Sequence, residues 1–372
     1  MLSVIIPCIV IILIVVFAAK YKFSHSITWR ESIFQLISLV IVLSFVYTVG
    51  INTGIRDVEV LNGQVTNKYQ KKENCSTGWN DYPDSFCSEY ETRSVYSHTT
   101  CTTVDKTEVC IDHYKTQYKY IYPWEKRWYV VTSFETVQIK RVDSQGAKEP
   151  SRWTEVLIGD PASTTHSYDN YMKIAYDNII NPKGMEYLET VPRYPIQNYD
   201  YYKSTKVVNS GVIGLDLKSF DLKVREILKT VGPKKQANII FLFTKNTDSS
   251  YRYAVESAWL GGKKNDIVVL IGGSKDRIVW ADVITLGGNA GNELFTIKVR
   301  DAILDNKIMN LNLVDIVAEL TLKHFDRKSM SDFEYLKEQI TPSSGLIWIC
   351  YLLTFIGSIL VTFITIKYDM FE

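Results

Sequence analysis

Several signatures of enzymatic chemistry are missing from this sequence of 372 residues. It contains no Gly-x-Ser-x-Gly elbow, no histidine pair at the spacing of a zinc protease and no Cys-x-x-Cys motif. Its five histidines, which include His166 and His324, are scattered along the chain. On these grounds we predict no catalytic residue.

An excess of charge of either sign is also absent, since the net charge at pH 7 is +1. This balance excludes a nucleic-acid partner held by bulk electrostatics. Tyrosine, in contrast, is abundant, with 24 residues. Because tyrosine combines an apolar ring with a polar tip, it suits half-buried strands and hydrated interfaces.

Three stretches contain no charged residue at all: 2–19, 33–51 and 345–366. At 1.5 Å per residue a helix over 33–51 is about 28 Å long, close to the thickness of the hydrocarbon core of a bilayer. The pattern predicts three transmembrane helices. The alternative for the first stretch is a short interfacial or re-entrant segment.

The flanking charges predict the orientation of these helices. Lys20, Lys22 and Arg30 lie between the first two stretches, and basic loops stay in the cytoplasm. The first stretch lacks the basic start of a signal peptide. We therefore expect a multi-pass membrane protein with its N-terminus and residues 52–344 outside the cytoplasm, periplasmic if bacterial, and Lys367 inside.

Four of the six cysteines cluster within residues 75–110 of the polar part. The run 101–110 reads CTTVDKTEVC, which fits a β-hairpin with its turn at 105–106. In that register Cys101 faces Cys110 as a non-hydrogen-bonded pair, with Cα atoms about 4.5 Å apart, and a disulfide can form at that spacing.

Cys75 and Cys87 would then form a second disulfide, although four cysteines allow three connectivities. The competing interpretation is a metal site made of these cysteines with His98 and His113. Since no Cys-x-x-Cys pair is present, we favour disulfides, which require an oxidising compartment and so agree with the exterior placement.

Residues 52–205 are predicted to form a β-rich domain. We expect a strand and a turn at Asn62-Gly63 within 59–69, a long strand over 127–141 and loops over 142–170. Large aromatic residues would anchor its core, with an aromatic ligand platform as the alternative; they are Trp124, Trp128 and Trp153. A domain boundary is expected near residue 200.

Residues 206–340 show the pattern of an α/β layer. Strands are predicted at 206–213, 238–243, 266–271 and 277–286. Helices are predicted at 219–231, where Gly232-Pro233 should end the helix, and at about 248–259, 292–306 and 313–325. A tight turn is expected at 272–276.

The stretch from about 207 to 325 resembles the TPM domain family of extracytoplasmic domains beside a membrane span. The family commonly opens with a Val-Val-Asp-x-Ala-Gly strand, and this chain has VVNSG at 207–211. WLGGKK (259–264), NDIVVL (265–270) and DRI (276–278) are similar to later family motifs. Asn209 stands where the family has Asp, and Ile267 where it has Gly, which counts against the metal binding or phosphatase chemistry that the resemblance implies.

Three further patterns could bind ions. GGSK at 272–275 follows a strand, but a strand rather than a helix comes after it, so a hairpin turn is favoured over a phosphate loop. The glycine-rich loop 287–291 precedes a predicted helix and could be a flexible or anion-binding loop, but a plain connector is favoured. Asp266, Asp276 and Asp282 could supply oxygen ligands to Ca²⁺ or Mg²⁺ if they converge, and are otherwise solvated turn carboxylates.

Together these features predict a membrane-anchored α+β protein with three transmembrane helices, a disulfide-linked β-rich domain and a TPM-like α/β sandwich. The expected function is non-catalytic: binding a membrane or envelope protein, or helping such a complex to assemble, through the Tyr-rich β domain and without a cofactor. A homo-oligomer is compatible with this. The alternative is a divalent-metal-dependent phosphatase of the TPM type.

Overall fold

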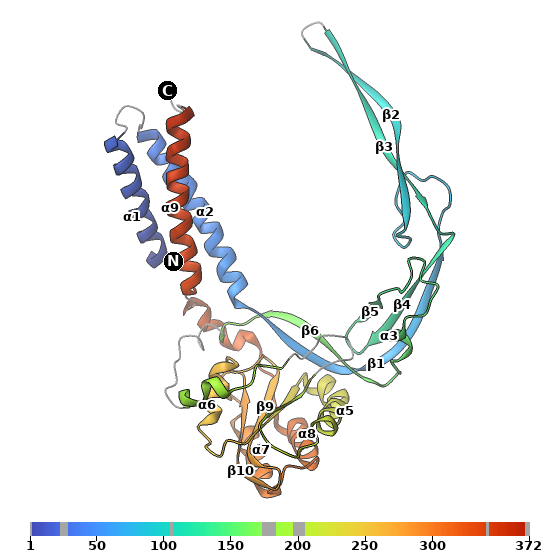
Figure 1. The fold of residues 1–372 in the computed structure, drawn as a ribbon, viewed down its shortest axis with the longest axis vertical. Helices are drawn as coiled ribbons and strands as arrows, with labels where there is room; N and C mark the ends of the chain where they lie inside the picture. Colours follow the sequence, from blue (N-terminus) through green and yellow to red (C-terminus); the bar gives the residue numbers. More distant parts are fainter. Residues whose placement is uncertain are drawn as a thin grey trace.

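A computed structural model describes residues 2–22, 29–104, 107–172, 184–195, 205–339 and 342–368. Three long helices lie side by side and form a bundle (Figure 1): α1 (Leu2–Lys22), α2 (Trp29–Ile55) and α9 (Ser344–Tyr368). Each is long and apolar enough to cross a membrane. All three contain the predicted charge-free stretches and extend beyond them by up to four residues at either end.

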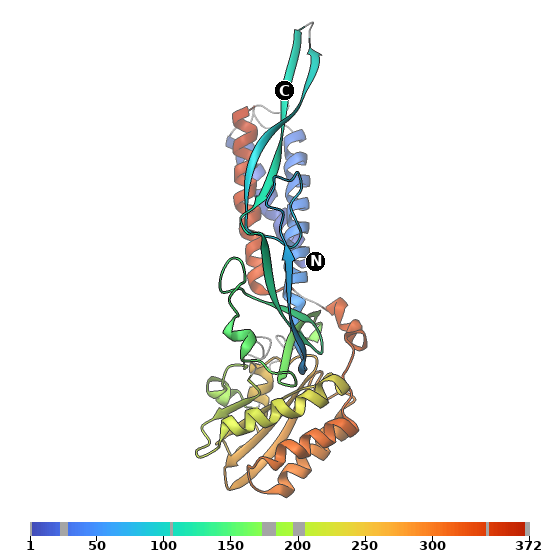
Figure 2. The ribbon, with the colours of Figure 1, turned by 90° about the vertical axis from the view of Figure 1, so that its right-hand side faces the viewer.

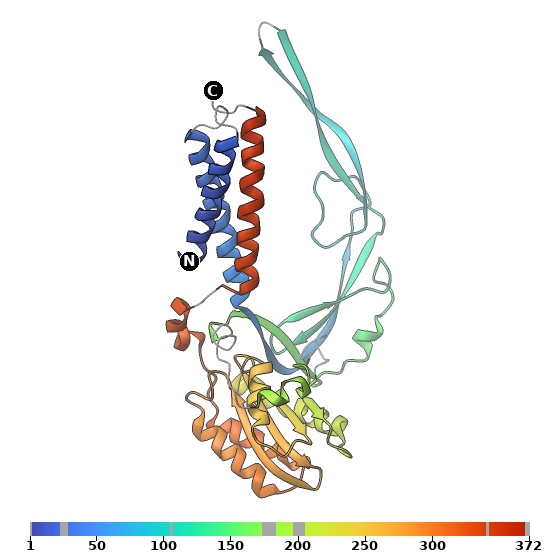
Figure 3. The same ribbon diagram turned by 60° about the vertical axis from the view of Figure 1, so that its left-hand side comes forward.

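The bundle has a small interior of its own. Val4, Cys8, Leu43 and Cys350 are buried together where the helices meet. Polar contacts also cross the bundle: Gln35 Nε2 donates to the backbone oxygen of Ser358 at 3.0 Å, and the Thr362 hydroxyl donates to Gln35 Oε1 at 3.4 Å. The C-terminal ends of α1 and α9 and the N-terminal end of α2 lie at the same end of the bundle (Figure 3).

Strand β1 (Arg56–Asn74) begins where α2 ends and organises the β-rich part. Its first half pairs with β6 (Pro161–Asp169) and its second half with β4 (Trp124–Thr132), which in turn pairs with β5 (Thr136–Ile139). The result is one curved antiparallel sheet in the order β5-β4-β1-β6 (Figure 1). A short helix, α3 (Ser151–Thr154), lies beside it.

Three predictions for this sheet were wrong. Asn62-Gly63 is not a turn, since Gly63 pairs with Ala162 in the middle of β1. Residues 127–141 are split between β4 and β5, which are joined by a turn. Residues 161–169 form β6 rather than a loop. That strand shows little hydrophobic alternation because much of it stays exposed, so its pairing depends on β1 and not on its own pattern.

The tryptophans take up different positions. Trp128 is buried in the core of this sheet with Val65, Val130 and Ile139. Trp153 packs on it edge-to-face, with ring centroids 4.8 Å apart. Trp124 lies partly exposed at the start of β4, and the Lys72 ammonium lies 4.2 Å from its ring centroid.

Strands β2 (Tyr90–Val104) and β3 (Thr107–Tyr120) form a separate two-stranded sheet. It projects from the curved sheet as a long arm (Figure 2). We call residues 90–104 and 107–120 the arm. The predicted turn at 105–106 lies outside the described residues.

The α/β part contains a sheet in the order β10-β9-β8-β7. Strands β7, β8 and β9 run parallel to one another, and β10 is antiparallel to β9. Its strands are β7 (Val207–Ser210), β8 (Asn238–Thr244), β9 (Asp266–Ser274) and β10 (Arg277–Thr285). Helices α5 (Leu217–Lys235), α7 (Glu293–Asn306) and α8 (Asn312–His324) cover one face, and α6 (Tyr251–Ala258) covers the other. The predicted order of elements is therefore confirmed.

Helix α5 does not end at Gly232-Pro233 as predicted. It continues to Lys235, and Gln236 adopts the left-handed conformation with φ 51°. Gly232 is needed for another reason: a Cβ there would overlap the Asn62 carbonyl oxygen of β1. The glycine therefore permits close packing of α5 on the β-rich sheet.

Residues 184–195 pack on the α/β part, whereas a boundary near 200 would place them in the β-rich domain. The 3₁₀ helix η1 (Met185–Thr190) contributes Tyr187, and Tyr194 follows it; both contact the core beneath α6. A second 3₁₀ helix, η2 (Met330–Gln339), buries Met330 and Phe333 against Tyr168 of β6.

The start of β1 is fixed to the α/β part by buried polar contacts. Asp57 accepts from Lys263, and Glu59 accepts from Arg327 Nη2 at 2.6 Å. The Asn62 amide donates to the Asn238 side chain at 3.1 Å. Because these groups are buried and mutually satisfied, the two parts are held in one orientation.

Candidate binding arm

The arm has two different faces, because alternate residues of a strand point to opposite sides. Cys101 pairs with Cys110, and counting along the register places one set of residues on the same side. We call this the tyrosine face: Tyr90, Thr92, Ser94, Tyr96, Thr99, Cys101, Glu108, Cys110, Asp112, Tyr114, Thr116, Tyr118 and Tyr120. Glu108 and Asp112 are its two charged residues.

Tyrosines dominate that face. The rings of Tyr96 and Tyr114 meet edge-to-face with centroids 6.1 Å apart, and the two side chains are 52% and 63% exposed. The ring of Tyr90 lies edge-to-face on Tyr118 at 5.2 Å. The Tyr96 hydroxyl lies 2.6 Å from Thr99 Oγ1. These contacts fix the rings in defined orientations while leaving large parts of their surface uncovered.

The opposite side, which we call the charged face, carries Glu91, Arg93, Val95, His98, Thr100, Ile111, His113, Lys115, Gln117 and Lys119. The loop before the arm contacts this face near its base. The Arg93 guanidinium lies 4.3 Å from the Trp79 ring centroid, and Lys115 Nζ lies 2.6 Å from Asp81.

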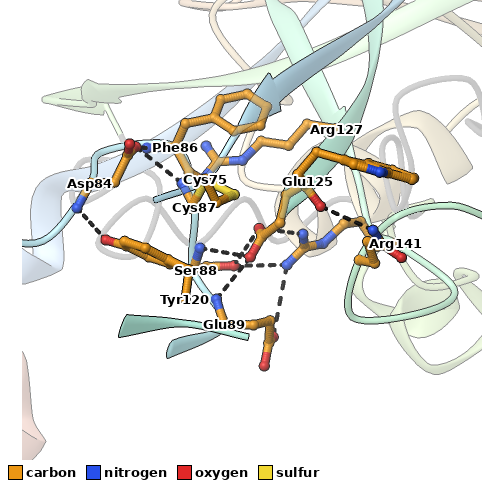
Figure 4. Close-up of a disulfide and its surroundings, with 12 residues drawn as sticks. Cys75, Asp84, Phe86, Cys87, Ser88, Glu89, Tyr120, Glu125, Arg127 and Arg141 are labelled. Atoms are coloured by element: carbon orange, nitrogen blue, oxygen red, sulfur yellow. Dashed lines mark hydrogen bonds and ion pairs between the residues drawn. A yellow bond between two sulfur atoms is a disulfide. The ribbon is translucent and has the colours of Figure 1, made fainter. Parts of the chain in front are cut away.

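The base of the arm is built around the disulfide Cys75–Cys87 (Figure 4). Phe86 and Tyr120 are buried with these two cysteines in one small cluster. Asp84 accepts from the backbone N–H of Phe86 at 2.6 Å, and the Asp84 N–H donates to the Tyr120 hydroxyl. The loop is thus connected to the last residue of β3.

Glu125 of β4 connects this loop to the curved sheet (Figure 4). Its fully buried carboxylate accepts from the backbone N–H groups of Ser88 and Glu89 at 3.0 and 2.9 Å, and from Arg141 Nη1 at 2.6 Å. Burial by itself would raise the pKa of Glu125, but the Glu89 N–H, the Arg141 guanidinium and the Ser88 N–H together lower it. The carboxylate is therefore charged at neutral pH and orients the arm.

The four clustered cysteines form two disulfides, Cys75–Cys87 and Cys101–Cys110. These are the favoured pairings, and the Cα atoms of the second are 4.0 Å apart. Glu108 lies close to the sulfurs of Cys101 and Cys110, but those sulfurs are bonded to each other. His98 and His113 lie on the other face of the arm, so they cannot share a metal ion with these cysteines.

The three predicted metal aspartates lie apart along one hairpin. Asp266 is the first residue of β9, and Asp276 lies in the turn beyond its end. Since β9 has nine residues, the two are separated by about 30 Å. Asp282 pairs with Leu270 in the middle of the hairpin and lies 3.1 Å from Arg252. They form no common metal site.

Asp266 is instead part of the buried junction. Its carboxylate accepts from the Tyr194 hydroxyl at 2.7 Å, from Asn238 Nδ2 at 2.8 Å and from the Lys263 N–H at 2.8 Å. Burial raises its pKa, and burial also lowers the pKa of the neighbouring Lys206 to about 7. Both side chains are almost completely inaccessible to solvent, so they bind structural partners and not a substrate.

The other patterns singled out above fold as connectors. GGSK at 272–275 belongs mainly to β9 and its turn, and 287–291 is the turn before α7. A groove of about 670 Å³ runs between α5 and the start of β6, where Asp160 and Pro161 line it. Its cations are already paired, Lys223 with Asp315 and Arg225 with Asp221 at 3.7 Å. It therefore offers little to an anionic ligand.

The residues at the base of the arm were missed by the sequence analysis. Glu125 and Arg141 are separated by 16 positions, and no motif links them. The strand 124–132 contains three charged residues in a row, Glu125, Lys126 and Arg127, so nothing in the local sequence marked Glu125 as the buried one.

No family model, curated protein or solved structure matches this chain. The resemblance to the TPM family therefore stays a prediction.

Proposed function

We propose that this protein is anchored in a membrane by α1, α2 and α9 and binds another membrane or envelope protein on the exterior side through its arm. The observation that carries the proposal is the uncovered tyrosine face. A two-stranded hairpin is marginally stable in water by itself, and the arm is held by a disulfide at each end instead of by a core. Such a construction keeps a rigid surface available for contact.

The composition of the tyrosine face suits a protein partner. Tyrosine gives a large contact area at a low entropic cost, and small hydroxyl residues add adaptable hydrogen bonds. Charged residues are depleted at the centres of protein interfaces. The tyrosine face meets both conditions, whereas the charged face does not.

Membrane placement is supported by two features. The disulfides fit an oxidising compartment. In addition, the fold brings the ends of the helices that carry Lys20, Lys22, Arg30 and Lys367 to one end of the bundle. By the positive-inside rule that end lies in the cytoplasm, and the β-rich and α/β parts then lie outside.

Photo-crosslinking in native membranes tests the proposal. The photoreactive residue p-benzoyl-phenylalanine would replace Tyr96 or Tyr114 in the full-length protein, and crosslinked products would be identified by mass spectrometry. We expect one discrete heterologous adduct from both positions, because the two rings are adjacent on the tyrosine face.

The matched controls are Leu322 on the outside of α8 and Val95 on the charged face of the arm, replaced in the same way. They should give little of that adduct. Equal adduct from Leu322, or none from either tyrosine position, would contradict binding through the arm. An adduct to a second copy would change the partner to the chain itself.

We do not propose the phosphatase activity that the TPM resemblance implies. The family's phosphatase chemistry would need carboxylates that converge on a cation, and Asp266, Asp276 and Asp282 do not converge. The α/β part is proposed to serve as the rigid base of the arm, through the buried contacts of β1.

A further inference from the structure

The charged face of the arm contains a pair of stacked histidines. The rings of His98 and His113 lie with their centroids 4.6 Å apart and their planes 17° apart. Both side chains are exposed, and the two residues are direct partners across the strands. The pair is therefore open to a ligand from solvent.

A β-bulge creates this pairing. Tyr96 pairs with Tyr114 and His98 pairs with His113, so Ser97 is an extra residue in β2. Without it His113 would face residue 97. Bulges commonly redirect side chains at functional positions. The extra residue also supplies the Ser97 hydroxyl, whose oxygen lies 3.1 Å from His98 Nδ1.

That contact resembles the environment of a metal-bound histidine. Ligating histidines generally use one ring nitrogen for the metal and the other for a hydrogen bond that holds the ring. With Nδ1 held by Ser97, Nε2 of His98 is the nitrogen left for coordination. The neighbouring Lys115 is ion-paired with Asp81 at 2.6 Å, which offsets its repulsion of a cation.

We propose that His98 and His113 together bind one first-row transition-metal ion, such as Zn²⁺, Ni²⁺ or Cu²⁺, with one imidazole nitrogen from each. Imidazole suits these ions, whereas Mg²⁺ and Ca²⁺ prefer oxygen. Among the described residues no third His, Cys, Asp or Glu groups with the pair. The other coordination positions are therefore filled by water or by a side chain of a bound protein.

The site does not depend on the proposed function, because it uses residues of the charged face. Binding requires the exposed rings to turn from the stacked arrangement so that both nitrogens point at one ion. A bound ion would join β2 to β3 between the two disulfides, and so would protect the middle of the arm.

The test uses the full-length protein in detergent with a tag that contains no histidine. Cu²⁺ is added at one equivalent and the nitrogen couplings are read by electron paramagnetic resonance. Zn²⁺ and Ni²⁺ are titrated by calorimetry, with Mg²⁺ as the negative control. We expect coupling to two imidazole nitrogens, one bound ion per chain, and affinity in the order Cu²⁺ > Ni²⁺.

The variants His98→Gln and His113→Gln should each weaken binding at least tenfold and leave coupling to a single imidazole from this site. The matched controls are His324→Gln, which removes a histidine from α8, and Asp112→Asn, which alters the opposite face of the arm. They should bind like the unaltered protein. Ser97→Ala should weaken binding by a smaller factor.

Binding by the double variant His98→Gln/His113→Gln that equals binding by the unaltered protein would overturn the proposal, as would the absence of any imidazole coupling. Because none of these substitutions lies at a buried position, an unchanged circular dichroism spectrum should accompany each of them. The readout needs no partner protein, so this result and that of the crosslinking experiment are independent.

Discussion

At the scale of single residues, the arm depends on one buried carboxylate. Glu125 accepts hydrogen bonds from two backbone N–H groups and from Arg141. Removing one member of such a group leaves the others desolvated and unpaired, which usually costs more than the interaction contributes.

We expect Glu125→Gln to lower the free energy of unfolding by about 2–3 kcal/mol, since the partly exposed Arg141 regains some hydration. Hydrogen exchange should rise at Ser88 and Glu89 in particular. Denaturant unfolding with exchange measured by mass spectrometry gives both numbers. The exposed Glu135→Gln is the control and should change stability by less than about 0.5 kcal/mol.

The same carboxylate predicts how the base of the arm responds to pH. Since folding lowers the pKa of Glu125, its contribution is fully present above the pKa of the unfolded chain. It is lost as pH falls through the lower, folded value. Exchange protection at Ser88 and Glu89 should therefore be constant from neutral pH down to about 5 and should fall below about 4. Loss of protection near neutral pH would contradict this assignment.

At the scale of elements, close packing of α5 on β1 depends on Gly232. An added Cβ would overlap the Asn62 carbonyl, and backbone cannot move aside as a flexible side chain can. We expect Gly232→Ala to destabilise the protein by about 2–3 kcal/mol and to loosen the junction, measured by denaturant unfolding. Gly78→Ala is the control, because its Cβ would meet only the Ser76 hydroxyl, at an ordinary contact distance of 3.9 Å. Equal effects of the two substitutions on the free energy of unfolding would contradict close packing of α5 on β1.

The arm is the other element whose stability can be tested separately. Its disulfide Cys101–Cys110 closes a short loop, and such a link contributes about 2–3 kcal/mol. Replacing both cysteines with serine should raise exchange throughout the arm and leave the α/β part unchanged, because the two do not share a core. The same replacement at Cys75 and Cys87 should also expose Phe86 and Tyr120. Exchange that rises equally everywhere would argue against an independent arm.

At the scale of the whole molecule, the arm and the helix bundle extend over the same part of the molecule's long axis. In all three ribbon views the described end of the arm reaches at least as far as the end of the bundle at which α1 ends and α2 begins (Figures 1 to 3). Charged side chains such as Glu91 and Lys119 are expensive in hydrocarbon. We therefore expect the arm to turn away from this position once a bilayer surrounds the bundle.

Thiol labelling of intact cells checks this expectation. A cysteine introduced by Ser94→Cys lies within β2 of the arm and should react with a membrane-impermeant maleimide added outside. A cysteine introduced by Lys22→Cys should react only after permeabilisation. Protection of position 94 would place the arm in lipid, and labelling of position 22 from outside would reverse the orientation.

The sequence by itself determined the features that depend on near neighbours. Charge-free length predicted the three helices, strand alternation placed Cys101 opposite Cys110, and the periodicity of 206–340 predicted the α/β order. These patterns arise from the geometry of a single helix or hairpin, so a short window of residues contains the information.

Tertiary structure decided the rest, because it depends on partners far apart in the chain. Asn62-Gly63 has the composition of a turn but continues a strand, since β6 pairs with it from a hundred positions away. Glu125 becomes buried only where Arg141 and the loop 75–89 meet it. Asp266 and Asp276 are close in sequence and far apart in space, because an extended strand separates them. Local pattern fixes the conformation of an element, whereas long-range pairing fixes which side chains meet.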